Sequence, residues 1–316
     1  MHKDIKLSII MPCYNEAELI EDSVSKVLTY LNTLECLSKD SFIMLVDDGS
    51  IDETWSIIER LSIQSDFVKG VKLSRNKGHQ NALLAGMEQV SNKCDCLISI
   101  DADLQQDERA IEKFIKKFSS GCEVVLGVRN DRKTDNFLKK ISALGFYKFM
   151  NIMGAHTTKN HADYRLLSNR ANNALLEFKE VNLFLRGLVG LIGFKTEYVY
   201  FDVSNRTAGE SKYTLLKMIA LAVDGITSFS VTPLRLISLT GFLLFLFSFI
   251  MSFYILIVSI FTDNVVPGWA STVLPIYFIG GVQILSIGVL GEYVGKIYQE
   301  TKQRPRYLIE RKTKGE

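Results

Sequence analysis

The sequence predicts an α/β protein built on a mostly parallel, doubly wound sheet and followed by a strongly apolar region. Short apolar runs at 6–11, 42–46, 68–73, 97–100 and 123–128 alternate with longer segments, several of which carry apolar residues at helical spacing. Strands that alternate with helices form parallel sheets covered on both faces. Each run also ends in polar residues, and ligands bind where the carboxyl ends of such strands meet. We therefore expect a ligand crevice at that edge.

The first expected strand, 6–11, stops at Pro12 and leads into Tyr14 and Glu16. An amphipathic helix is expected over 17–34, because leucine, isoleucine and valine recur on one of its faces. The glycine pattern G-x-G-x-x-G does not follow this strand, which argues against a dinucleotide-dependent dehydrogenase.

Polar loops also follow the second and third expected strands. The second ends in Asp47-Asp48-Gly49-Ser50, and either Ser50 or Asp52 can cap the next helix. The third is followed by the polar segment 75–80 and by a helix rich in alanine and leucine that ends near Val90.

The fourth expected strand ends in two carboxylates, Asp101 and Asp103, with Gln105 two positions further on. Two carboxylates this close repel each other unless a cation lies between them. Mg²⁺ takes oxygen ligands, typically one or two carboxylates together with substrate phosphates. The simplest interpretation is a divalent metal held against a diphosphate, and a solvated acidic turn is the alternative.

Two long stretches lack charged residues, 236–261 and 264–291. Each is long enough to cross a bilayer of about 30 Å as a helix. We expect two transmembrane helices, at about 236–261 and 272–293, within a membrane region spanning 236–295. The net charge of +2, without a basic cluster interleaved with aromatic residues, argues against nucleic acid as a partner.

The charges around the apolar stretches predict their orientation. The connection 262–272 contains Asp263 but no lysine or arginine, whereas 296–316 is a basic tail. The positive-inside rule then places both polar ends in the cytosol. Residues 1–4 lead directly into the first strand, so we expect no signal peptide, and the five cysteines lack the spacing of a disulfide framework.

The expected organisation has four parts: a cytosolic domain at 1–205, a juxtamembrane segment at 206–235, the membrane region at 236–295 and the tail at 296–316. Residues 213–231 are mostly apolar, so they form either an interfacial helix on the membrane or a core helix of the soluble domain. Both interpretations stay open.

Four motifs occur in order along the chain: Pro12-x-Tyr14-Asn15-Glu16, Asp47-Asp48-Gly49-Ser50, Asp101-x-Asp103-x-Gln105 and Arg206…Ser211-Lys212. On these residues the chain resembles the inverting glycosyltransferases of the GT-A type, family 2. More narrowly, it is similar to the polyprenyl-phosphate glycosyltransferases, and the branch of bacterial bactoprenol glucosyltransferases fits best. The resemblance implies a GT-A, Rossmann-like catalytic domain followed by interfacial helices and a two-helix transmembrane hairpin.

The resemblance also implies roles for individual residues. The nucleotide-sugar would be bound by Pro12, Tyr14, Glu16, Asp48, Asp101, Ala102 and Asp103. Mg²⁺ or Mn²⁺ would be held by Asp101, Asp103 and Gln105. Phosphates and the acceptor would be bound by Arg129, Arg206, Ser211 and Lys212. The chain departs from the family at 106–108, where a proline-containing stretch is usual, and we expect this to affect the start of a helix and not the ligands.

The catalytic residues implied by the resemblance are Asp101, Asp103, Asp163 and Arg129. Asp163 matches a carboxylate sometimes assigned as a general base. A lipid phosphate is already an anion near neutral pH, so it can attack without losing a proton. We therefore expect Asp163 to orient Arg165 or the sugar, and a structural salt bridge is the alternative.

The expected activity is inverting transfer of a hexose, with glucose favoured, from a UDP-sugar to undecaprenyl (polyprenyl) phosphate for cell-surface glycan modification. Alternatives are another donor (GDP-mannose, UDP-galactose or an amino-sugar), a non-catalytic membrane-anchored binding protein, and a transporter of the lipid-linked sugar. The expected setting is the bacterial inner membrane, where a multi-pass homo-oligomer in contact with membrane lipid has its catalytic domain in the cytosol.

Overall fold

The computed structural model describes residues 4–103, 105–130, 161–180, 185–202, 232–261 and 268–313. The chain forms two compact units. The first is built around an eight-stranded sheet, and the last residues of the chain, from Arg304, belong to it. The second contains two long helices.

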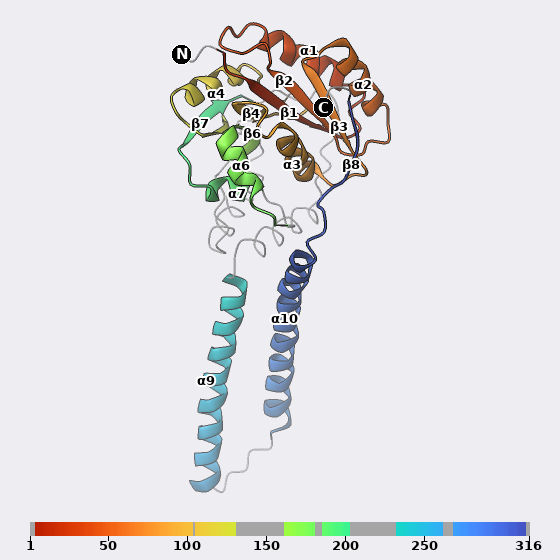
Figure 1. Ribbon diagram of the computed structural model, residues 1–316. Helices are drawn as coiled ribbons and strands as arrows, with labels where there is room; N and C mark the ends of the chain where they lie inside the picture. The colour runs from red at the N-terminus through yellow and green to blue at the C-terminus, as the bar shows by residue number, and fades with distance from the viewer. Residues whose placement is uncertain are drawn as a thin grey trace. The chain divides into compact units, whose positions relative to one another are not determined.

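The sheet has the strand order β7-β5-β6-β4-β1-β2-β3-β8 (Figure 1). Its strands are β1 (Leu7–Cys13), β2 (Phe42–Asp47), β3 (Val68–Leu73), β4 (Cys96–Ser99), β5 (Val124–Arg129), β6 (His161–Ser168), β7 (Thr196–Phe201) and β8 (Ile309–Lys312). β1 pairs in parallel with β2 and β4, as do β2 with β3 and β5 with β7. The predicted mostly parallel α/β sheet is confirmed.

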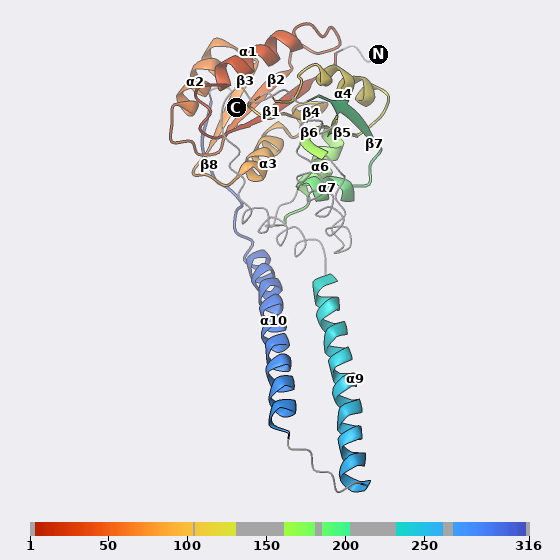
Figure 2. The same cartoon turned by 180° about the vertical axis from the view of Figure 1, so that it is seen from behind.

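Helices cover both faces of the sheet, as a doubly wound fold requires (Figures 1 and 2). They are α1 (Ile20–Leu31), α2 (Thr54–Gln64), α3 (His79–Val90), α4 (Ala110–Ser119), α6 (Asn169–Leu176) and α7 (Leu185–Leu191). α1, α2 and α4 share one hydrophobic core with alternate residues of β1, including Leu7, Ile9 and Met11. α3 lies on the other face.

The burial of the central strands follows from this double cover. All seven residues of β1 are buried, which is typical of a strand with helices on both sides. α3 packs unusually close to the sheet at Gly86, where an added Cβ would lie 2.5 Å from Cγ2 of Ile10 and 3.0 Å from Cγ2 of Val46. This close packing fixes the position of α3.

Two antiparallel strands were not predicted. β6 lies between β4 and β5 and runs antiparallel to both, with Arg165 opposite Ser99. β8 runs antiparallel to β3, at the far edge of the sheet. The N–H of Thr313 donates to the carbonyl of Gly70, and the N–H of Gly70 donates to Oγ1 of Thr313, both at 2.9 Å. Part of the segment expected to be a basic tail is therefore sheet.

The second unit contains α9 (Thr232–Phe261) and α10 (Trp269–Thr301). The expected spans at 236–261 and 272–293 fall within these helices. Among the described residues, one stretch, Phe278–Thr301, is long and apolar enough to cross a membrane, and Thr232–Leu244 is a shorter apolar stretch. The segment 213–231 lies outside the described residues.

Candidate active site

The loops after β1 and β2 are joined by hydrogen bonds at the carboxyl edge of the sheet. The N–H of Asn15 donates to Oγ of Ser50 at 2.9 Å, and the N–H of Ile51 donates to Oδ1 of Asn15 at 3.1 Å. The N–H of Glu16 donates to Oγ1 of Thr54, also at 2.9 Å. The motif residues around Tyr14 and those after β2 are thus held next to each other.

The loop after β2 also packs against the loop after β3. Gly49 has a φ of +69°, a backbone conformation that favours glycine. A Cβ at this position would also lie 2.5 Å from the backbone carbon of Arg75, so any larger residue would clash. Asp48 is buried, and its two carboxylate oxygens accept the N–H groups of Lys77 and Gly78 at 2.7 and 2.8 Å. Burial raises the pKa of Asp48 despite these two bonds. Asp48 therefore fixes the residues that lead into α3.

Asp101 follows β4 and is held by Gln106, which is not among the predicted site residues. Nε2 of Gln106 donates to Oδ2 of Asp101 at 2.6 Å, and the N–H of Asp101 donates to Oε1 of Gln106 at 3.1 Å. The expectation that residues 106–108 affect only the helix start was wrong, because Gln106 contacts an expected metal ligand. Burial raises the pKa of Asp101, and the nearby Asp163 and Asp103 carboxylates raise it further.

The two expected metal carboxylates differ in their contacts. Oδ1 of Asp103 accepts the N–H of Gln105 at 3.2 Å, whereas Oδ1 of Asp101 lies 3.6 Å from Nε2 of His79. In the described parts of the chain, no group of three or more His, Cys, Asp or Glu side chains is arranged to hold a metal ion. Two partly exposed carboxylates nevertheless fit a Mg²⁺ or Mn²⁺ ion that shares its remaining ligands with a substrate diphosphate.

Asp163, on β6, accepts hydrogen bonds from two arginines. Nη2 of Arg165 donates to its Oδ1 at 2.6 Å. Arg186 donates from Nε to Oδ1 at 3.1 Å and from Nη2 to Oδ2 at 2.8 Å. Nε2 of His79 lies 3.7 Å from Oδ2. Burial alone would raise the pKa of Asp163, but Arg165, Arg186 and His79 together lower it well below its usual range.

The other expected site residues have different surroundings. Pro12 is buried in β1, Tyr14 is exposed, and the carbonyl of Ala102 accepts a hydrogen bond from Oγ of Ser23. Arg129 ends β5 with its side chain exposed, and its charge lowers the pKa of Asp101 against the effect of burial. Arg206, Ser211 and Lys212 lie outside the described residues.

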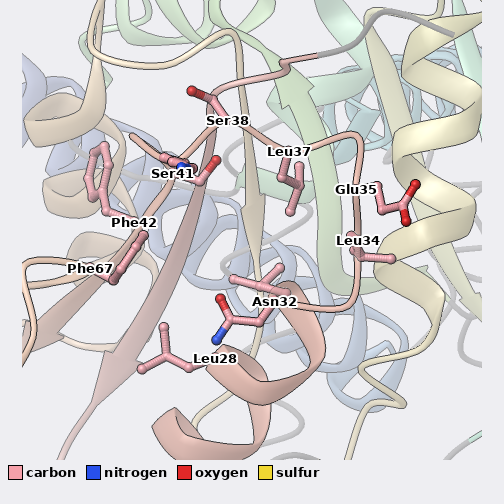
Figure 3. Close-up of a pocket in the computed structure, with 11 residues that line it drawn as sticks. Leu28, Asn32, Leu34, Glu35, Leu37, Ser38, Ser41, Phe42 and Phe67 are labelled. Carbon is pink, nitrogen blue, oxygen red and sulfur yellow. The ribbon is translucent and has the colours of Figure 1, made fainter.

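A separate hollow lies at the other end of β2, near its first residue, Phe42 (Figure 3). Its lining also includes Leu28, Leu34, Leu37 and Phe67. None of the expected site residues lines this hollow. The polar loops at the carboxyl ends of the strands therefore remain the candidate site.

The fold and these loops define a GT-A-type catalytic domain, in which paired carboxylates follow the fourth strand of a mostly parallel sheet. The chain belongs to glycosyl transferase family 2, whose profile matches residues 8–178. It is therefore a glycosyltransferase.

Curated relatives match almost the entire chain. "Uncharacterized glycosyltransferase YkoT" of Bacillus subtilis (strain 168) is 46% identical over 307 residues, which cover 96% of this chain and 91% of that protein. "Bactoprenol glucosyl transferase" of Shigella phage SfX is 38% identical over 306 residues, with 96% and 99% covered. Among solved structures, mannosyl-3-phosphoglycerate synthase from Rubrobacter xylanophilus is 13% identical, with a TM-score of 0.47 and 75% of each chain covered.

Proposed function

We propose that this glycosyltransferase moves a hexose, with glucose favoured, from a UDP-sugar to polyprenyl phosphate with inversion at the anomeric carbon. The observation that carries the proposal is the end-to-end similarity to relatives named bactoprenol glucosyl transferase, of which the SfX protein is 99% covered. The partly exposed carboxylates after β4 support it, because a nucleotide-sugar donor brings a diphosphate that needs a counter-charge.

The donor would bind across the loops after β1, β2 and β4. Pro12, Tyr14 and Glu16 would line the nucleoside pocket with Asp48. A carboxylate has about four lone-pair positions, and Asp48 uses two of them on backbone N–H groups. It can therefore still accept a hydrogen bond from the ring N–H of uracil.

The leaving diphosphate would be bound next to Asp101 and Asp103. A Mg²⁺ or Mn²⁺ ion held by these carboxylates, with Gln105 as a further ligand, would act as a Lewis acid on the leaving group. Gln106 keeps one oxygen of Asp101 in place through its 2.6 Å hydrogen bond. Arg129, Arg206, Ser211 and Lys212 would supply further donors to phosphate oxygens.

Asp163 serves as a positioning residue in this proposal and not as a general base. Its carboxylate already accepts hydrogen bonds from Arg165 and Arg186, and its lowered pKa makes it a poor proton acceptor. The acceptor needs no base, because a phosphate monoester is an anion near neutral pH. Because the pKa of Asp163 lies well below its usual range, this carboxylate stays ionised between about pH 5 and 9, and we expect it to cause no change in rate over that range.

The acceptor is a lipid, which suits the apolar second unit. We propose that α9 and α10 cross the bacterial inner membrane as a hairpin and that the catalytic domain faces the cytosol. The basic residues of 296–316 and their absence from 262–272 support this orientation. Homo-oligomer formation stays a prediction.

The test is a transfer assay on membranes that contain the full chain. Polyprenyl phosphate is incubated with labelled UDP-glucose, UDP-galactose, a UDP-amino-sugar or GDP-mannose, with Mg²⁺ or Mn²⁺ or with excess EDTA. We expect label from UDP-glucose to enter the lipid only when the metal is present. Label from a different donor would replace glucose in the proposal, and the absence of lipid label from every donor would contradict it.

A further inference from the structure

Gln106 is a buried polar side chain that makes two hydrogen bonds to a single residue, Asp101. It is only 1% exposed. Its Oε1 accepts the N–H of Asp101 at 3.1 Å, and its Nε2 donates to Oδ2 of the same residue at 2.6 Å. A buried amide costs free energy unless it is hydrogen-bonded, and its donor and acceptor atoms lie side by side. Asp101 therefore accounts for the burial of Gln106.

The carboxylate of Asp101 needs a partner of this kind, because other charges act on it. The nearby Asp163 and Asp103 carboxylates repel it and raise its pKa, and Nε2 of His79 lies 3.6 Å from its Oδ1. The side chain of Asp101 is 32% exposed, so packing alone does not fix its orientation. The hydrogen bond from Gln106 to Oδ2 does.

The backbone of the loop that joins β4 to α4 is held by other side chains. Three hydroxyl groups donate to its backbone carbonyls: Ser23 to Ala102 at 2.6 Å, Tyr164 to Asp107 at 3.1 Å and Tyr30 to Arg109 at 3.3 Å. These carbonyls lie on both sides of Gln106 in the sequence. The loop thus has its own attachments to α1 and β6, and the amide of Gln106 acts on the carboxylate.

We propose that Gln106 is a positioning residue, which sets the orientation of the Asp101 carboxylate for a divalent cation. The inference rests on the proposed function, in which Asp101 and Asp103 hold Mg²⁺ or Mn²⁺. Side chains that hydrogen-bond to metal ligands orient those ligands, and their loss typically weakens metal binding about ten- to a hundredfold. Gln106 acts through Asp101 and does not itself touch the cation.

The test compares Gln106→Met with Ser23→Ala in the full chain. Methionine keeps the length of the side chain but has no amide to donate to the carboxylate. Ser23→Ala is the matched control, because it removes another 2.6 Å hydrogen bond, at the next residue of the same loop, and leaves the partner of the carboxylate in place. Binding of Mn²⁺ in the presence of UDP is measured from the electron paramagnetic resonance signal of free Mn²⁺, and a melting temperature is measured for each variant.

We expect Gln106→Met to weaken Mn²⁺ binding about tenfold or more, whereas Ser23→Ala should stay within about twofold of the wild type. If the methionine variant does not fold, Gln106→Asn decides. Asparagine keeps the amide on a side chain that is one methylene shorter, so it cannot reach both the N–H and the carboxylate of Asp101, and Mn²⁺ binding should again be weakened.

Equal Mn²⁺ affinities of the Gln106 and Ser23 variants would overturn the inference, even if both melt at lower temperatures, because Gln106 would then only stabilise the loop. The measurement needs neither lipid nor sugar transfer, so an error in the proposed donor sugar or acceptor does not affect it. A wild-type chain that bound no Mn²⁺ with UDP would overturn the proposed metal and this inference together. Normal binding by both the wild type and Gln106→Met would overturn the inference alone.

Discussion

Asp163 and Arg165 form an ion pair in which the arginine is fully buried and the carboxylate is 12% exposed. Asp163→Asn removes the counterion of Arg165, so we expect the free energy of unfolding to fall by about 3–5 kcal/mol. Thermal unfolding of the purified full chain measures this change. Asp40→Asn is the control, because Asp40 is exposed and lies 3.9 Å from Lys6. An equal, small effect of both substitutions would contradict the prediction.

The stabilisation by Asp163 also has a predictable pH dependence. The pKa of Asp163 is lower in the folded chain than the value of about 3.9 expected after unfolding. Its contribution is therefore fully present above about pH 4 and is lost as the pH falls towards the folded pKa. The stability difference between the wild type and Asp163→Asn should shrink below about pH 4, and a difference that grew there would have the wrong sign.

A substitution at Asp103 tests whether a bound metal ion takes part in the reaction. Asp103→Asn removes one ligand charge from a partly exposed loop, so we expect the fold to stay intact. We expect turnover to fall about a hundredfold or more, because the Lewis-acid stabilisation that is lost is worth several kcal/mol. Asp107→Asn is the matched control, since the Oδ1 of Asp107 accepts the N–H of Arg109 at the start of α4. Full activity of Asp103→Asn, or of the wild type in excess EDTA, would exclude this role.

Residues of the site could be predicted from the sequence where the features that identify them lie close together in the chain. Asp101 and Asp103 follow an apolar strand, and the contact of Asp163 with Arg165 joins residues two positions apart on one strand face. His79 and Arg186 were missed, because their place in the site depends on how α3 and α7 pack. No sequence pattern near His79 or Arg186 predicts how these two helices pack.

Among the elements, β8 could not be predicted from the sequence. Its four residues, Ile309–Lys312, are mostly charged and exposed, so they lack the apolar alternation of a strand. Tertiary contacts hold the segment instead: the Tyr307 hydroxyl contacts Glu88, and Nζ of Lys312 donates to Oε1 of Gln89 at 2.5 Å. Both partners lie on α3, the helix that begins with His79. β6 was hidden for a related reason, because its buried residues include Tyr164 and Arg165.

Thr313 tests how firmly this last segment is attached. Thr313→Val keeps the methyl group near Gly70 but removes the hydroxyl that accepts the buried N–H of Gly70. An unsatisfied buried donor costs about 1–3 kcal/mol, so we expect thermal unfolding of the full chain to shift down accordingly. Thr301→Val is the control, because the Thr301 hydroxyl donates only to the carbonyl of Ile297 one turn earlier, at the C-terminal end of α10. Equal melting temperatures for the two variants would show that the segment is not held there.

At the scale of the whole molecule, charge and hydropathy predict the topology. The first five strands and the apolar helices were identified because buried strands and long helices need continuous apolar runs. The joining of residues 304–313 to the first unit could not be predicted, since pairing between β3 and β8 depends on chain segments more than two hundred residues apart.

Cysteine labelling tests the proposed orientation. The proposed hairpin requires the connection before α10 to be outside and β8 to be in the cytosol, because lysine and arginine are retained on the cytosolic side. The native cysteines interfere little, since Cys13, Cys94, Cys96 and Cys122 are buried and Cys36 can be replaced by serine. A cysteine at Gly268 should react with an impermeant maleimide on intact cells, whereas one at the exposed Glu310 should react only after lysis. Labelling of Glu310→Cys on intact cells would reverse the orientation, and protection of both positions until lysis would exclude a hairpin that crosses the membrane.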